Sequence, residues 1–152
     1  MPIRINRLSQ LKPEVQQLLE EARLVSRNAY NPYSKFFVGA AVRVESGKIF
    51  RGTILENASY GLTICAEAAA LAASNTENAG PVAMIAIVGG QSEEEIGPAV
   101  TPCGRCRQLL HESSHGRRRD IEVYCANLQL SEIWLTTADE LLPLAFGPKS
   151  LY

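Results

Sequence analysis

The sequence lacks both a long apolar run and an excess of charge of one sign. A helix that spans a bilayer takes roughly 20 consecutive apolar residues, and no stretch of the 152 residues approaches that length. Residues 1–6 also lack the charged start and long apolar core of a secretory signal. The formal net charge is −1, whereas proteins that hold phosphate backbones usually carry a basic face. We therefore expect a cytoplasmic protein with no membrane or nucleic-acid partner.

Basic clusters and aromatic residues are also scarce. The one basic run is Arg117, Arg118 and Arg119, and Asp120 follows it directly. We interpret this run as a solvated turn rather than a nucleic-acid patch. Aromatic residues make up only 7% of the chain, which leaves few side chains for stacking the bases of a polynucleotide.

The remaining composition is typical of one globular domain. Hydrophobic residues make up 46% and charged residues 20%, which are ordinary values for a folded chain. A chain of this length can bury a substantial core. Because no repeat, linker or low-complexity segment divides the chain, we expect a single domain over residues 1–152.

The apolar pattern predicts alternating helices and strands. Pro13 suits the first turn of a helix, and the apolar residues at helical spacing over 15–25 give that helix one buried face. Residues 82–88 are continuously apolar, as in a strand covered on both faces. The order of elements predicts an α/β fold, a three-layer α/β/α sandwich around a mixed five-stranded sheet. The expected helices are 13–29, 65–73, 103–112 and 138–142, and the expected strands are 36–44, 49–55, 82–88, 121–124 and 132–135.

Three of the four cysteines stand in two short motifs, Cys65-Ala-Glu67 and Pro102-Cys103-Gly-Arg-Cys106. A C-x-x-C at a helix start places both sulfurs on one side of the first turn, where the helix N-terminus also favours thiolates. A third thiolate from Cys65 makes three ligands and leaves one position open. An open position is typical of a catalytic rather than a structural zinc site. We expect one Zn²⁺ per subunit on these three cysteines.

Glu67 follows the first ligand by two residues. From there its carboxylate can reach a zinc-activated water without binding the metal and can serve as a general acid and base. The alternative is a glutamate that only stabilises a helix N-terminus. The combination C-A-E with a downstream P-C-x-x-C favours catalysis, because it is the three-cysteine variant of the zinc nucleobase deaminase signature.

A non-catalytic zinc module is the alternative from another class. It would need a closed four-ligand site, with Cys125 as the candidate fourth ligand, and it would give Glu67 no role. We interpret Cys125 as a buried small residue on a strand. His111 and His115 lie at or beyond the end of the second cysteine helix, and we interpret both as surface residues.

At these motifs the sequence resembles the small, homotetrameric cytidine deaminases that act on free nucleosides. The resemblance starts at 31–36, continues through 52–60 and both cysteine motifs, and ends at 141–146. It implies hydrolytic deamination of cytidine or deoxycytidine to uridine or deoxyuridine plus ammonia. It also implies a homotetramer in which Tyr60 and Phe146 line a neighbouring subunit's site.

The resemblance implies further contacts with a nucleoside. Phe36 is similar to the aromatic residue that packs against the pyrimidine, and Glu56 to the carboxylate that holds a ribose hydroxyl. The backbone at Ala66 and the side chain of Glu67 resemble the groups that read the cytosine ring. Without the resemblance, plain core packing would be the simplest interpretation of Phe36 and of Phe146.

Two positions depart from the family pattern. Ile54 stands where the family has an asparagine that binds the ribose, and losing one hydrogen bond typically costs about 1 kcal/mol. A modified cytosine nucleoside or a blasticidin-type antibiotic is therefore an alternative substrate. Ala68 stands where many relatives have an arginine that offsets the charge of three thiolates. We expect Arg105 or Arg107 to supply that positive charge instead.

Overall fold

The computed structural model describes residues 1–115 and 119–151, so Arg117 and Arg118 of the basic run lie outside the described residues. The described chain forms a six-stranded sheet in the order β1-β6-β5-β4-β2-β3. Strands β4 and β5 are parallel and every other neighbouring pair is antiparallel. The strands are β1 (Ile3–Ile5), β2 (Phe37–Val44), β3 (Ile49–Thr53), β4 (Val82–Gly90), β5 (Glu122–Asn127) and β6 (Ile133–Thr137).

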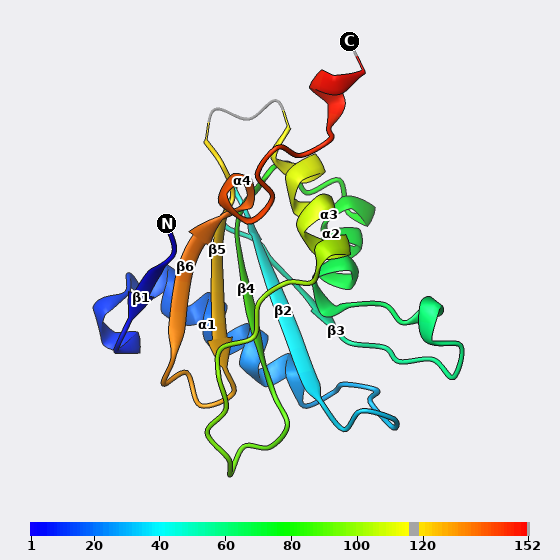
Figure 1. Cartoon of the computed structure of the whole chain (residues 1–152). Helices are drawn as coiled ribbons and strands as arrows, with labels where there is room; N and C mark the ends of the chain where they lie inside the picture. Colours follow the sequence, from blue (N-terminus) through cyan, green and yellow to red (C-terminus); the bar gives the residue numbers. More distant parts are fainter. Residues whose placement is uncertain (116–118, 152) are drawn as a thin grey trace.

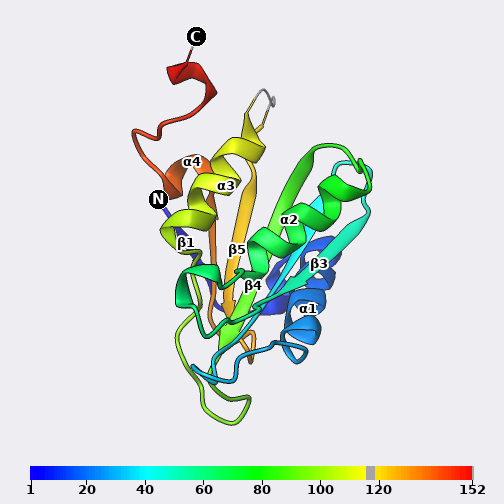
Figure 2. The ribbon, with the colours of Figure 1, turned by 90° about the vertical axis from the view of Figure 1, so that its right-hand side faces the viewer.

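Helices cover both faces of this sheet. Figures 1 and 2 show α1 on one face and α2 and α3 together on the other. The predicted three-layer α/β/α sandwich with a mixed sheet is confirmed, and so is the predicted order of helices and strands. The α-helices are α1 (Pro13–Ser26), α2 (Ala66–Thr76), α3 (Gly104–Ser114) and α4 (Ala138–Leu141).

The predicted strand count was one too low. The extra strand, β1, pairs antiparallel with β6, with Ile3 opposite Leu135 and Ile5 opposite Ile133. Three residues are too few to show an alternating pattern, so this strand depends on its partner rather than on its own sequence. Helix α1 also ends at Ser26 rather than at 29. Beyond it the Tyr30 amide donates to the Ile54 carbonyl (3.1 Å), which draws the chain into an extended path.

Alternate residues of the central strands supply two separate cores, as the period of two in a strand requires. The core toward α2 and α3 includes Leu110 of α3 and Ala70 of α2. The core toward α1 includes Leu18, Leu19 and Ala22 of that helix. The strand residues of the first core include Ala40, Val42, Ile85, Ile87, Val123 and Cys125, and those of the second include Ala41, Ala86, Val88, Tyr124 and Ala126.

Helix α2 lies unusually close to β3 because Gly52 has no side chain. A Cβ atom at Gly52 would lie 2.3 Å from the Ala66 carbonyl oxygen and 2.4 Å from the Ala70 amide nitrogen. Real Cβ atoms do not approach backbone atoms so closely, so any larger residue would push the helix outward. Gly52 therefore determines how deeply the N-terminus of α2, which follows Cys65, sits against the sheet.

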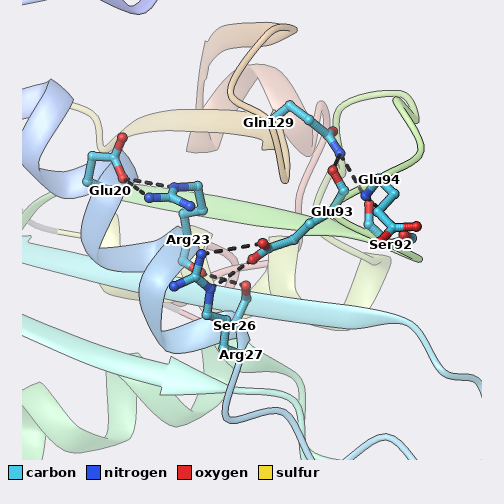
Figure 3. Close-up of polar contacts among 8 residues, drawn as sticks. All are labelled: Glu20, Arg23, Ser26, Arg27, Ser92, Glu93, Glu94 and Gln129. Atoms are coloured by element: carbon cyan, nitrogen blue, oxygen red, sulfur yellow. Dashed lines mark hydrogen bonds and ion pairs between the residues drawn. The ribbon is translucent and has the colours of Figure 1, made fainter.

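The connection from β4 to α3 leads the chain from the sheet to Cys103, and Figure 3 shows how its first part is held. The Gln129 side-chain amide donates to three carbonyl groups of this connection, those of Ser92 (3.2 Å), Glu93 (2.9 Å) and Glu95 (3.0 Å). Arg27, which follows α1, pairs with Glu93 at 2.8 Å. Both partners of that ion pair are half exposed, so we attribute most of the bracing to Gln129.

Among the described residues, the helices are all too short or too polar to cross a membrane.

Candidate active site

The two cysteine motifs meet at the N-termini of α2 and α3. Cys65 is the N-cap residue of α2, Cys103 is the N-cap residue of α3, and Cys106 lies in the first turn of α3. The three Sγ atoms lie within 4.8 Å of one another, and those of Cys65 and Cys103 are 3.8 Å apart. Two sulfurs that each bind zinc at about 2.3 Å with tetrahedral angles lie about 3.8 Å apart. The spacing therefore fits a tetrahedral zinc site.

The backbone also favours negative charge at this place. Neither Cys65 nor Cys103 uses its side chain to cap its helix. The first amide groups of both helices are therefore left uncapped by these side chains, and their partial positive charge lies at the end of each helix where the sulfurs gather. This arrangement stabilises thiolates, which are the form of cysteine that binds zinc.

The thiols of Cys65 and Cys106 perturb each other strongly. A hydrogen bond with the Cys106 thiol lowers the pKa of Cys65 to about 6. The same hydrogen bond, together with burial and the nearby Glu67 carboxylate, raises the pKa of Cys106 far above its usual range. Only a cation at the centre would allow all three to ionise together. The donor set therefore fits Zn²⁺, which prefers sulfur and nitrogen ligands.

Glu67 lies beside this cluster in the first turn of α2 and is only 4% exposed. Burial is the main cause that raises the pKa of its carboxyl group, and the charge of Cys65 adds to the effect. A raised pKa brings a carboxyl group closer to the range in which it can both accept and release a proton. The structure thus places Glu67 where the sequence predicts an acid–base group.

The two arginines between and after the ligands have different surroundings. The Arg105 guanidinium donates to the Thr63 carbonyl (3.3 Å), and its charge helps to lower the pKa of Cys65. Arg107 instead donates to the carbonyls of Pro102 (2.9 Å) and Leu141 (3.3 Å). Arg107 therefore links the segment before Cys103 to the end of α4. The charge of Arg105, by contrast, acts on the sulfur of Cys65.

A pocket forms where the chain folds back on itself between β3 and α2, just before Cys65 in the sequence. Leu55 and Ile64 pair as an antiparallel bridge, through N–O distances of 2.9 and 3.0 Å. The segment between them leaves the sheet and returns immediately before Cys65. It helps to form a pocket of about 340 Å³. The lining residues are Tyr33, Ser34, Glu56, Asn57, Tyr60 and Thr63.

The structure distributes the predicted substrate residues between this pocket, the core and the surface. Glu56 and Tyr60 line the pocket, and Ala66 is fully buried at the start of α2. Phe36 and Ile54 are partly buried and pack against the core that faces α2 and α3. Tyr60 is 78% exposed and Phe146 is 65% exposed, and the Phe146 carbonyl accepts a hydrogen bond from Gln108 of α3 (2.9 Å).

The residues considered as alternative ligands do not join the sulfurs. Among the described residues, the group able to hold a metal contains three cysteines and excludes Cys125. Cys125 is buried on β5, and burial raises its pKa to about 12. His111 faces Asp139 of α4 at 3.4 Å and lies against Gly147. These surroundings support a three-ligand site with an open position.

Sequence reasoning missed several pocket residues. Tyr33 and Ser34 fall within the matching segment 31–36 without a predicted role, and Thr63, two residues before Cys65, was not predicted as a pocket residue. Tyr33 packs edge-on against Tyr60 with ring centroids 6.2 Å apart. The polar run Asn31-Pro-Tyr-Ser34 directly before an apolar strand was the available signal, since turn residues at strand ends often carry function.

An α/β/α sandwich with an open three-cysteine zinc site and a buried glutamate beside it defines the class of zinc-dependent deaminases, which are hydrolases. The comparison with protein families agrees, because residues 12–119 match the family model described as the cytidine and deoxycytidylate deaminase zinc-binding region. The chain belongs to this family. Its metal is zinc, and the three-cysteine group is the zinc site that the structure offers.

Individual relatives show the same similarity over nearly the whole chain. A cytidine deaminase from Halalkalibacterium halodurans is 44% identical over 136 residues, which is 90% of this chain and 96% of the relative. One from Sporosarcina psychrophila is 38% identical over 138 residues, covering 91% and 95%. The crystal structure of cytidine deaminase from Burkholderia pseudomallei is 39% identical, covers 90% of this chain and 100% of that one, and superposes with a TM-score of 0.76.

Proposed function

We propose that this protein hydrolyses the exocyclic C–N bond of cytidine or deoxycytidine as free nucleosides, giving uridine or deoxyuridine and ammonia. The observation that carries the proposal is the juxtaposition of Cys65, Cys103 and Cys106 with the buried Glu67. The relatives at 44% and 38% identity are named cytidine deaminase. In this proposal the three cysteines are the zinc ligands and Glu67 is the catalytic residue.

Bound zinc supplies a Lewis acid that lowers the pKa of water enough to make it a nucleophile near neutral pH. Glu67 takes one proton from this water and delivers it to the ring nitrogen next to the reacting carbon. The water oxygen bonds to the carbon that bears the amine. Glu67 then moves the proton of the new hydroxyl group to the amine, the C–N bond breaks as the C=O bond of the product forms, and ammonia leaves. The Ala66 backbone and Glu67 hold the cytosine ring during these steps.

The adjacent pocket suits the sugar of a nucleoside. Its volume of about 340 Å³ leaves room for a ribose. The Glu56 carboxylate at its wall can accept hydrogen bonds from sugar hydroxyls. Phe36 contributes an apolar ring for the pyrimidine.

The proposal includes an assembly and a location. Tyr60 and Phe146 are large, exposed and near the site, which supports a homotetramer in which they line a neighbouring subunit's pocket. Three reduced thiols as metal ligands are typical of a reducing compartment, which supports a cytoplasmic protein. Residues 1–152 act as one domain in this proposal, since one sheet carries both cores.

The direct test is a substrate panel monitored by ultraviolet absorbance. It should contain cytidine, deoxycytidine, an N4-substituted cytidine and blasticidin S, with zinc-loaded protein. We expect turnover of cytidine or deoxycytidine. No turnover of any compound by zinc-loaded protein would favour a non-catalytic zinc module.

Ile54 is the observation that keeps a modified cytosine nucleoside or a blasticidin-type antibiotic as a second candidate substrate. Its backbone amide and carbonyl are both engaged, with Val38 and Tyr30, so only its side chain can affect a ligand. That side chain offers no hydrogen bond to a sugar.

Ile54→Asn should therefore raise kcat/KM for cytidine by about fivefold, the equivalent of one hydrogen bond of about 1 kcal/mol. Steady-state kinetics on the same panel measures the change, and Ile54→Val is the matched control that keeps an apolar side chain. A gain for blasticidin S but none for cytidine would reverse the order of the two candidate substrates.

Of the two arginines, Arg105 is the one whose contacts favour a role in offsetting the negative charge of the zinc site. Arg107 instead hydrogen-bonds backbone carbonyl groups. Zinc with three thiolates carries one negative charge, and Arg105 is the cation that acts on Cys65. Arg105→Ala should lower zinc affinity by about tenfold, at the low end for a residue that supports a metal ligand. Competition with a chromogenic chelator measures it, with Arg27→Ala as a remote control. Unchanged zinc retention with an unchanged pH–rate profile would rule out the charge role.

A further inference from the structure

The turn before β2 is held by a single buried carboxylate. The turn spans 31–35 and ends with Lys35 in the left-handed region (φ 58°), where its amide donates to the Asn31 carbonyl (3.0 Å). A residue other than glycine adopts this conformation only where its surroundings enforce it. Glu56 holds the two residues before Lys35, because its Oε2 accepts hydrogen bonds from the Tyr33 amide (2.9 Å) and the Ser34 amide (3.2 Å).

The Ser34 hydroxyl extends this arrangement to Phe36. It hydrogen-bonds Glu56 Oε1 on one side and the Phe36 amide, at 3.0 Å, on the other. An amide nitrogen can only donate and an ionised carboxylate can only accept. The hydroxyl must therefore accept from Phe36 and donate to Glu56, so its proton has one orientation. Glu56, Ser34 and Phe36 form a directional chain of hydrogen bonds from the pocket wall to the backbone amide of the residue that carries the ring.

This chain also determines what remains of Glu56 for a ligand. A carboxylate offers about four lone-pair directions, and three are already occupied by Tyr33 and Ser34. The Ser34 hydroxyl is the main cause that lowers the pKa of Glu56, followed on the lowering side by the Tyr33 and Ser34 amides. The carboxylate is thus ionised and oriented, with about one acceptor direction left toward the pocket.

We propose that Ser34 is a positioning residue that couples Glu56 to Phe36, so that the acceptor for the sugar and the ring for the base are oriented together before a substrate binds. The inference rests on the proposed nucleoside deamination. A group held in its bound geometry in advance loses less entropy when the ligand arrives. Ser34 therefore acts on affinity, whereas the proton transfer stays with Glu67.

The test compares Ser34→Ala with Ser34→Thr, which keeps the hydroxyl. We expect Ser34→Ala to raise KM for cytidine about tenfold with kcat within twofold, because binding is weakened equally in the ground state and the transition state. Ser34→Thr should stay within twofold of wild type for both. Ser59→Ala is the matched control, because Ser59 is a nearby exposed serine whose hydroxyl makes no hydrogen bond within 1–115 and 119–151.

A second measurement works without any substrate. Amide order parameters from NMR relaxation should place Phe36 near the rigid value of about 0.85 in wild type and toward 0.6 in Ser34→Ala. Ser34→Thr should retain the rigid value. A kinetic loss shared by Ser34→Thr, or a Phe36 amide as rigid in Ser34→Ala as in wild type, would overturn the proposal.

The two measurements separate the two ideas. If wild-type protein turned over no nucleoside, the proposed function would fail, while the order parameters would still decide whether Ser34 couples Glu56 to Phe36. If Ser34→Ala loosened Phe36 but left KM unchanged, the coupling to substrate binding would be wrong although the deaminase activity would stand.

Discussion

Glu67→Gln is expected to lower kcat by about 10⁴-fold while the protein keeps its zinc, since general acid–base catalysis contributes up to about that factor. Glutamine has nearly the same shape but cannot accept or release a proton, so the proton path from water to ring nitrogen to amine is cut. The buried position of Glu67 means that few other groups can replace it. Single-turnover kinetics on cytidine measures the loss, and metal analysis confirms the zinc content.

The control for this variant is Glu77→Gln. Glu77 caps the other end of α2, is exposed and pairs with Lys48. It should therefore reproduce any general effect of removing one negative charge from that helix without affecting turnover. Substantial activity in Glu67→Gln would refute the proton-shuttle role and leave Glu67 as a residue that only stabilises the helix N-terminus.

Cys106→Ala should abolish zinc binding at micromolar metal and remove all measurable activity. A thiolate that contributes one of three ligands cannot be replaced by a methyl group, and the remaining two sulfurs do not make a zinc site. In wild type, adding zinc should raise the unfolding temperature, because a ligand at 1,000 times its Kd stabilises the folded state by about 4 kcal/mol. Calorimetry should show no such rise in Cys106→Ala.

Cys125→Ala is a closely matched control. Both cysteines are fully buried, Cys106 on α3 and Cys125 in the core that faces α2 and α3. The two substitutions should cost similar packing energy, of the order of 1 to 2 kcal/mol. Only Cys106→Ala should lose the response to zinc. If Cys125→Ala lost it as well, Cys125 would be a fourth ligand, and the closed, non-catalytic site would be the better interpretation.

Much of the fold was predictable because its core strands are strongly patterned. The continuous apolar run that became β4 and the helical stripe that became α1 each imply one kind of element, and the structure has both. The missed strand β1 is exposed at Ile3 and Arg4, so it has no buried face for a pattern to reveal. Its pairing with β6 is a long-range contact that local sequence does not encode.

The cluster of three cysteines that could hold a metal was predictable for a different reason. Chemistry limits which residues can hold zinc, and a C-x-x-C at a helix start constrains two sulfurs within a single turn. The relation of Glu56 to Ser34 had no such local signal, because 22 residues separate the two side chains. Nothing in either segment alone indicates that the carboxylate would hold the turn before β2.

The amino-acid sequence by itself therefore determined the kind of chemistry. Few functions other than metal-assisted catalysis combine three cysteines and a glutamate at the starts of two helices. Only the tertiary structure decided which groups meet. The close approach of α2 to β3 at Gly52, the return of the chain through Leu55 and Ile64, and the separation of Cys125 from the other sulfurs all depend on packing between distant segments. The chemical reactivity of a side chain is a property of its residue type and can be read from the sequence. The distances between side chains are set only when the two cores pack against the sheet.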